Sequence, residues 1–125
     1  MAGETLHEDK AVLGKDILDR HRAISTIMEE LEAIDWYDQR IAGSDNAELR
    51  AVLTHNRDEE KEHASMLLEW LRRNDPAFSR QMRAQLFREG PIKETSAIEA
   101  ETSSEGPNTD GSLGIGGLRP TGGSR

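Results

Sequence analysis

The 125-residue chain contains no cysteine. Disulfides, thiolate zinc sites and cysteine-ligated iron–sulfur clusters are therefore excluded, and the composition fits a reducing compartment. Long apolar runs are also missing, because no stretch approaches the roughly 20 apolar residues that a membrane span needs. The opening stretch, MAGETLHEDKAVLGKD, lacks the apolar region of a secretory signal. We therefore expect neither a membrane span nor secretion.

Positive charge is scarce as well. The chain has 24 acidic against 16 basic residues, which gives a formal net charge of −8. Nucleic-acid binding requires a basic face, so no nucleic-acid partner is expected, whereas acidic excess suits hard cations. The last third is poor in large apolar residues, so the folding unit is nearer about 80 residues, a size at which a core is marginal alone. Oligomerisation would enlarge the buried core, so we expect the chain to associate with further copies of itself.

A first long helix is predicted from about Asp16 to Ala42. Its apolar residues recur at alternating steps of three and four, the period of a helix that packs along a seam. The seam residues are Ile17, Ile24, Ile27, Leu31, Ile34 and Ile41. The helix should end where the stretch GSDN begins at Gly43, because these are turn residues.

A second long helix is predicted to begin at Asp45. Asp45 is a good N-cap, and Glu48, three residues on, completes a capping box. The helix should end near Arg73, because the stretch NDP brings a proline. Its expected inner face comprises Leu49, Val52, Leu53, Asn56, Glu60, His63, Leu67 and Trp70.

A short third helix should follow, capped by Asp75 with Pro76 in its first turn. Phe78, Met82 and Leu86 form its apolar stripe, and the pair Gly90–Pro91 should end it. The prediction is therefore an all-α fold: an antiparallel two-helix hairpin plus a short C-terminal helix.

The remaining segments differ in composition from this helical domain, which we place at residues 13–90. Residues 1–12 are polar and are expected to be poorly ordered, and residues 91–109 are expected to form a flexible linker. Residues 110–125 include DGSLGIGGLRP, in which apolar side chains lie among glycines. This tail is too short to build a core, so we expect it to dock on another surface.

The stretch RDEEKEH, residues 57–63, contains the first candidate metal ligands. Glu60 and His63 stand three apart, so they share one helix face, and they interrupt an apolar stripe. A carboxylate facing a core is costly unless it is paired or bound to metal. In an antiparallel hairpin with a short turn, residues whose numbers sum to about 90 lie opposite each other, which places Glu30 level with Glu60. Tyr37 shares the stripe of Glu30.

One Glu plus one Glu-x-x-His is half of the ligand set of a di-iron carboxylate centre in a four-helix bundle. The chain supplies two long helices, so a two-fold dimer of hairpins would provide four helices and the other half of the site. The alternative is coincidence: charged runs are mostly solvated helix surface, and Glu-x-x-His occurs often by chance. Three features together favour a metal site over coincidence. Glu30 and Glu60 lie at the same level of the hairpin, Glu60 and His63 share one helix face, and the chain supplies half of a four-helix ligand set.

Two further clusters follow helical spacing. Glu29, Glu32 and Trp36 form the outer trio, and their carboxylates suit weak, exchangeable binding of Fe²⁺ on its way to the core site. Calcium or another divalent cation is an alternative occupant, and an exposed acidic face is the alternative reading. A third cluster comprises His55, Glu59 and Glu62. It fits either a metal at a subunit contact or a solvated face.

Two long stretches, RHRAISTIMEELEAIDWYDQR and LTHNRDEEKEHASMLLEWLRRND, resemble the encapsulated ferritin family. The likeness covers about residues 15–90. The terminal DGSLGIGGL resembles the peptide that loads cargo into encapsulin nanocompartments.

The resemblance implies a ferroxidase, which oxidises Fe²⁺ to Fe³⁺ at a di-iron centre across a dimer interface, with two irons per subunit dimer. Its ligands would be Glu30, Glu60 and His63, with Tyr37 close by. The outer site would comprise Glu29 and Glu32, with Trp36 beside them. The resemblance also implies an open ring-shaped decamer, a pentamer of dimers. It implies a cytoplasmic location inside an encapsulin shell, reached through residues 110–118, where the mineral is stored.

Two other functions remain open at this point. A non-enzymatic helical adaptor would dimerise through the seam and present the tail without needing metal. Another di-metal carboxylate protein, such as a rubrerythrin-like peroxidase or a manganese protein, would use the same ligands. The sequence does not decide between oxygen and peroxide as oxidant, nor among iron, manganese and zinc.

Overall fold

The computed structural model describes residues 6–94, and within that range every regular element is a helix. The helices are α1 (Lys10–Gly43), α2 (Ala47–Asn74) and α3 (Pro76–Gln85). The all-α hairpin with a short third helix is therefore confirmed. The chain divides into two compact units, one ending at Asn74 and one beginning at Asp75, which are taken in turn. The tail and most of the predicted linker lie outside the described residues.

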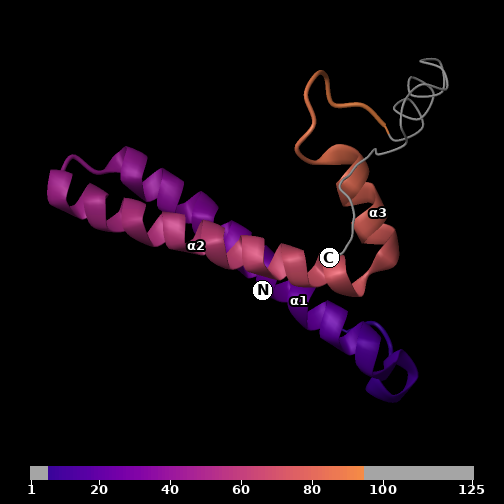
Figure 1. Ribbon diagram of the computed structural model, residues 1–125. Helices are drawn as coiled ribbons and strands as arrows, with labels where there is room; N and C mark the ends of the chain where they lie inside the picture. The colour runs from indigo at the N-terminus through magenta and orange to yellow at the C-terminus, as the bar shows by residue number, and fades with distance from the viewer. Residues whose placement is uncertain (1–5, 95–125) are drawn as a thin grey trace. The chain divides into compact units, whose positions relative to one another are not determined.

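Helices α1 and α2 run antiparallel and side by side as the first unit (Figure 1). The turn between them spans residues 44–46. The side-chain oxygen of Asn46 accepts the Leu49 N–H at 2.9 Å, and the Ser44 hydroxyl oxygen accepts the Asn46 N–H at 3.2 Å. Asn46 is thus the residue that caps α2. The prediction of Asp45 as cap, with Glu48 closing a capping box, was wrong by one residue.

α1 begins earlier than predicted and is broken near its start. Gly14 adopts φ 81° and ψ 169°, a left-handed region that favours glycine, between the turn Lys10–Leu13 and the long helix that follows. Residues 10–12, which the sequence placed in the poorly ordered segment, are helical. The break separates this first turn from the part of α1 that packs on α2.

The inner seam is the line along which α1 and α2 face each other, and its members are buried or half-buried. It follows alternating steps of three and four on both helices, the spacing of an antiparallel coiled coil. On α1 it comprises Arg20, Ala23, Ile27, Glu30, Ile34, Tyr37 and Ile41. On α2 it comprises Leu53, Arg57, Glu60, Ala64, Leu67 and Leu71. The small side chains of Ala23 and Ala64, only 6% and 4% exposed, let the two backbones approach closely.

Half of the predicted seam lies instead on an exposed outer row. Ile27, Ile34 and Ile41 face α2 as expected. The outer row of α1 comprises Ile17, Ile24, Met28 and Leu31, which are 38–53% exposed. The outer row of α2 carries the exposed apolar side chains of Leu49, Val52, Met66 and Trp70, with the polar residues Asn56, Glu59 and His63 between them. The hairpin therefore leaves apolar surface uncovered on both helices.

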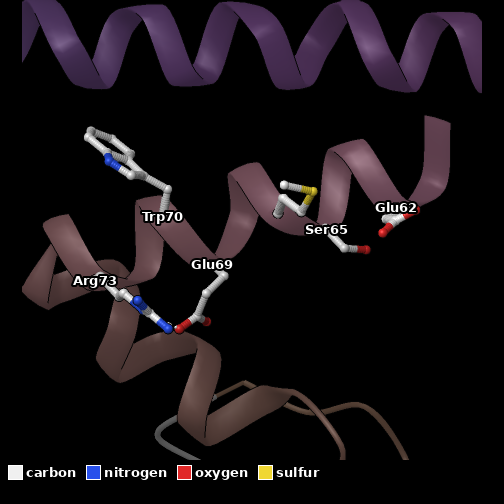
Figure 2. A pocket seen from close by; sticks show the side chains of 6 residues that line it. Glu62, Ser65, Glu69, Trp70 and Arg73 are labelled. Atoms are coloured by element: carbon white, nitrogen blue, oxygen red, sulfur yellow. Dashed lines mark hydrogen bonds and ion pairs between the residues drawn. The ribbon is translucent and has the colours of Figure 1, made fainter. Parts of the chain in front are cut away.

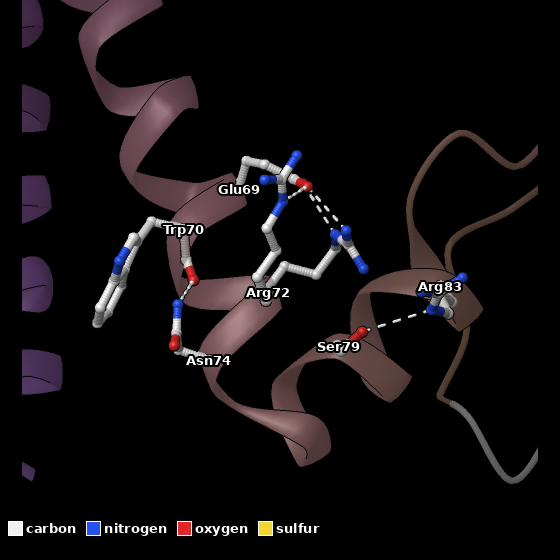
Figure 3. Close-up of polar contacts among 7 residues, drawn as sticks. Glu69, Trp70, Arg72, Asn74, Ser79 and Arg83 are labelled. Carbon is white, nitrogen blue, oxygen red and sulfur yellow. Dashed lines mark hydrogen bonds and ion pairs between the residues drawn. The ribbon is translucent and has the colours of Figure 1, made fainter. Parts of the chain in front are cut away.

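The C-terminal end of α2 is held by a compact ionic group (Figure 3). Arg72 binds both carboxylate oxygens of Glu69 at 2.8 and 2.7 Å, and Arg73 donates to the same carboxylate at 2.7 Å. These hydrogen bonds lower the pKa of Glu69 to about 2. The Asn74 side chain donates to the Trp70 carbonyl, and the Arg20 guanidinium lies 3.5 Å from the Asn74 carbonyl across the hairpin. Basic residues here also suit the negative end of the helix dipole.

The second unit contains α3. The Asp75 carboxylate accepts the Phe78 N–H at 3.0 Å, and Pro76 opens the helix, as predicted. The helix ends at Gln85, five residues before Gly90, so the predicted end was too late. Phe87, at φ 59°, has left the helical conformation. No described helix is long and apolar enough to cross a membrane.

Candidate metal centre

The hairpin brings together one carboxylate from α1 with a carboxylate and an imidazole from α2. The nearest side-chain donor atoms of Glu30, Glu60 and His63 all lie within 4.8 Å of one another. The His63 Nδ1 is 3.0 Å from the Glu60 carboxylate and 3.8 Å from that of Glu30. Within residues 6–94 this is the one group of three or more potential ligands so close together. The predicted convergence of these three residues is confirmed.

The electrostatics of the group follow from its crowding. A hydrogen bond with Glu60, together with burial, raises the pKa of Glu30 above its usual 4.5, whereas the same bond lowers the pKa of Glu60. The Glu60 carboxylate also raises the pKa of His63. Glu30 therefore retains its proton to higher pH than an isolated glutamate does. A bound cation would replace that proton, because ligands must be deprotonated to coordinate a metal.

The donor set fits iron. Two carboxylates and one imidazole suit first-row divalent ions and, as anionic oxygen donors, the harder Fe³⁺. The Glu30 and Glu60 side chains are 21% and 24% exposed, whereas that of His63 is 47% exposed. His63 lies on the outer row of α2, three and seven residues before Met66 and Trp70. The centre is thus open toward a surface that also carries exposed apolar side chains.

Tyr37 lies on the inner seam, seven residues and so about two helical turns from Glu30. Its ring, like that of Trp36, lies near the Arg40 guanidinium, whose central carbon is 5.9 Å from the Tyr37 ring centre and 5.7 Å from that of Trp36. These are cation–π distances. Within the hairpin the tyrosine is therefore aligned with the ligand Glu30 but makes its described contact with Arg40.

The other predicted ligands form no three-residue group within one chain. In the outer trio Glu29 is half-buried, while Glu32 and Trp36 are exposed. His55 lies 3.4 Å from the Glu59 carboxylate as an exposed pair.

Glu62 lines a depression of about 510 Å³ on α2 (Figure 2). Met66 and Trp70 line the same depression. The roles of the outer trio and of the third cluster therefore stay predictions.

Sequence reasoning missed one residue near the centre. Arg57 lies on the inner seam, one turn before Glu60, and pairs with Asp38 of α1 at 3.0 Å. It was treated as part of a solvated charged run. Its seam spacing, four residues after Leu53 and three before Glu60, was the signal that could have revealed it.

An antiparallel hairpin that presents Glu on one helix and Glu-x-x-His on the other is the half-bundle of the ferritin-like di-metal carboxylate class. The helical hairpin therefore places the chain among proteins with a ferritin-like fold. The chain belongs to the EncFtn-like family, whose model matches residues 5–89. The resemblance to encapsulated ferritins is thereby confirmed.

Individual relatives agree with this assignment. The chain is 52% identical to an encapsulated ferritin-like protein of Rhodospirillum rubrum, over 94% of this chain and 90% of that protein. It is 50% identical to a ferritin-like protein of Thermotoga maritima, over 87% and 93%. An encapsulin nanocompartment cargo protein, EncC of Myxococcus xanthus, is 44% identical over 40% of this chain and 38% of its own. A crystal structure of a Nitrosomonas europaea protein matches with TM-score 0.69 and 49% identity, over 73% of this chain and all of that one.

Proposed function

We propose that this protein is a ferroxidase that oxidises Fe²⁺ to Fe³⁺ at a centre completed by two copies of the chain. The observation that supports it most directly is the cluster of Glu30, Glu60 and His63, which gives three donor atoms within 4.8 Å and opens on the outer row. Three donors leave a divalent ion short of ligands. A second hairpin would supply the other three and cover the exposed apolar side chains around the opening.

The chemistry follows from the donors. Iron is the substrate, and anionic carboxylates stabilise Fe³⁺ more than Fe²⁺, which favours oxidation. Each Fe²⁺ gives up one electron, and two irons together supply two electrons to an oxygen-derived acceptor. Any proton that Glu30 still holds would be released when metal binds, because a carboxylate must be deprotonated to coordinate a metal. His63, which lies at the open side, leaves coordination positions for exchange.

Assembly and location extend the proposal. Dimers would assemble further into an annular decamer, an open ring that oxidises iron without enclosing the mineral. Residues 110–118, which lie outside the described part of the chain, would bind an encapsulin shell and place the ring inside a nanocompartment. Two relatives support this, since the Rhodospirillum protein is named an encapsulated ferritin-like protein and the Myxococcus protein an encapsulin nanocompartment cargo protein. Glu29 and Glu32, with Trp36, would form the outer site that passes Fe²⁺ inward.

The test is stopped-flow oxidation of Fe²⁺, added without oxygen and then mixed with air, followed by ferric absorbance. We expect Glu60→Ala and His63→Ala to reduce the rate to that of iron in protein-free buffer. Matched controls are Glu89→Ala and His21→Ala, which remove the same side chains away from the centre. Size-exclusion chromatography of each sample should place the activity in dimers or larger species. Full activity in both ligand variants, or in an isolated monomer, would contradict the assignment.

A further inference from the structure

The hairpin needs something to fix the register of its two long helices. Among the described residues the buried apolar side chains are only Ala23, Ile27, Ala64 and Leu71. The seam repeats every seven residues, so an alternative register would still place apolar residues opposite one another. The proposed metal ligands do not fix the register, because Glu30 and Glu60 repel each other once both are ionised and no metal is bound.

Arg57 makes contacts that can fix the register of the two helices. Its side chain lies on the inner seam with only 23% exposure. One guanidinium nitrogen, Nη1, lies 3.0 Å from Asp38 on α1, and Nε lies 3.1 Å from Asp58 on its own helix. The contact with Asp58 fixes the orientation of the planar guanidinium, and the contact with Asp38 ties it to one level of α1.

The contact lies close to the metal centre. Arg57 is one helical turn from Glu60 on the side of the interhelical turn. On the other side of the centre, the Arg20 guanidinium lies 3.5 Å from the Asn74 carbonyl. Two cross-helix arginine contacts therefore flank the ligands, and the shorter one belongs to Arg57.

We propose that Arg57 is a positioning residue: by joining Asp38 to Asp58 it fixes the register in which Glu30 reaches Glu60 and His63. A charged residue at a seam position commonly specifies register at little gain in stability. The structural half of this inference concerns the hairpin alone, while its consequence for iron oxidation rests on the proposed function. Lysine cannot replace Arg57 fully, because one ammonium group cannot hold both carboxylates in a fixed plane.

The decisive variant is Arg57→Leu. Leucine suits an apolar seam, so the helices and their thermal stability should be retained while the register is released. Because the chain has no cysteine, Ser25→Cys and Ser65→Cys introduce one unique spin-label site on each helix. Pulsed electron spin resonance, with labelled chains diluted in unlabelled protein, then measures the distance across the hairpin. We expect one narrow distribution in the parent and a broadened or shifted one in Arg57→Leu, by about 5 Å per helical turn of slippage.

The matched control is Arg50→Leu. Arg50 lies seven residues earlier on the same helix, but its described contact is with the Ser44 carbonyl in the turn, at 3.3 Å. This variant should keep the parent distribution. A second measurement is Co²⁺ affinity, read from visible absorbance, which needs no redox chemistry. We expect it to weaken about tenfold in Arg57→Leu, the scale of lost support to metal ligands, and to recover partly in Arg57→Lys.

The outcomes separate this inference from the proposed function. A parent-like distance distribution in Arg57→Leu overturns the register role, whatever happens to activity. A parent protein that oxidises no iron, combined with a shifted distribution in Arg57→Leu, sinks the ferroxidase proposal and leaves the register role standing. If Arg57→Leu does not fold, Asp38→Asn removes the charged acceptor on α1, and the same distance measurement decides.

Discussion

Replacing Glu30 with glutamine should stabilise the metal-free protein and abolish its response to metal. Glu30 and Glu60 meet at the inner seam, where a hydrogen bond with Glu60 raises the pKa of Glu30. Glutamine keeps the size of the side chain and its ability to donate to Glu60, but it carries no charge. At a pH where both carboxyl groups are ionised, the substitution therefore replaces a repulsion with a hydrogen-bond donor.

The magnitude follows from the separation and the solvent. Two unit charges 4.8 Å apart, the limit for this cluster, repel by about 1 kcal/mol at the dielectric constant of water and about 3.5 kcal/mol at an effective value of 20. The two carboxylates are 21% and 24% exposed, so water screens them partly. We therefore expect a gain of about 1–2 kcal/mol in the free energy of unfolding at pH 8.

The effect of Glu30→Gln on the free energy of unfolding depends on pH. The folded-state pKa of Glu30 lies above its ordinary value of 4.5, so the folded state holds this proton more tightly than the unfolded state does. Stability therefore falls as pH rises from about 4.5 through the raised pKa, and the full penalty applies above it. Below 4.5 the carboxyl is protonated in both states. The advantage of Glu30→Gln should accordingly vanish at pH 4.

The assay is urea unfolding followed by circular dichroism, with chelator present and at one protein concentration, because assembly makes apparent stability concentration-dependent. Glu89→Gln, the same change in the exposed segment after α3, is the control and should alter stability little. Repeating the measurement with Co²⁺ should stabilise the parent and not Glu30→Gln. A gain that is absent at pH 8, or equal at pH 4 and pH 8, would refute the reasoning.

Two further predictions concern residues outside the core cluster. Glu32→Ala should slow Fe²⁺ oxidation at low iron concentration while Co²⁺ binding at the core site is kept; an unchanged rate would identify the outer trio as solvated surface, for which only a small electrostatic effect is expected. Deletion of residues 110–125 should leave oxidation and assembly intact but abolish co-purification with a co-expressed encapsulin shell. Normal packaging of the shortened chain would refute the targeting role, and loss of assembly would make the tail structural.

The hairpin and the meeting of its ligands were predictable because they depend on local chemistry. Turn residues between two periodic segments fix an antiparallel pair, and the length of the turn fixes which levels meet. That is enough to bring Glu30 opposite Glu60. The predicted cap of α2 was Asp45 and the observed cap is Asn46. Asp and Asn are about equally good N-caps, so the sequence alone does not decide between two neighbouring residues of these types.

Which apolar row faces inward was not predictable from spacing alone. Ile24 and Ile27 belong to rows of similar composition that are related by a rotation about the axis of α1. Only packing against α2 selects the second, and it also places Glu30 and Arg57 on the inner seam instead of at its border. Arg57 was missed for this reason. The many charged residues in RDEEKEH suggest an exposed helix surface, whereas the spacing of Arg57 from Leu53 and Glu60 places it on the inner seam. The break at Gly14 likewise depends on a backbone conformation that any glycine permits.

The two seam alanines bear on which ion the proposed centre prefers. Distances between packed helix axes range over about 2 Å with the size of the side chains at the contact, whereas metal–ligand bonds tolerate errors of about 0.2 Å. Ala64 follows His63 directly in the chain and is 4% exposed, so its volume bears on how far Glu30 stands from Glu60. Divalent cations are told apart by the size and rigidity of the cavity that holds them. In the proposed centre, ion selectivity would therefore depend partly on the methyl group of Ala64, which is not itself a ligand.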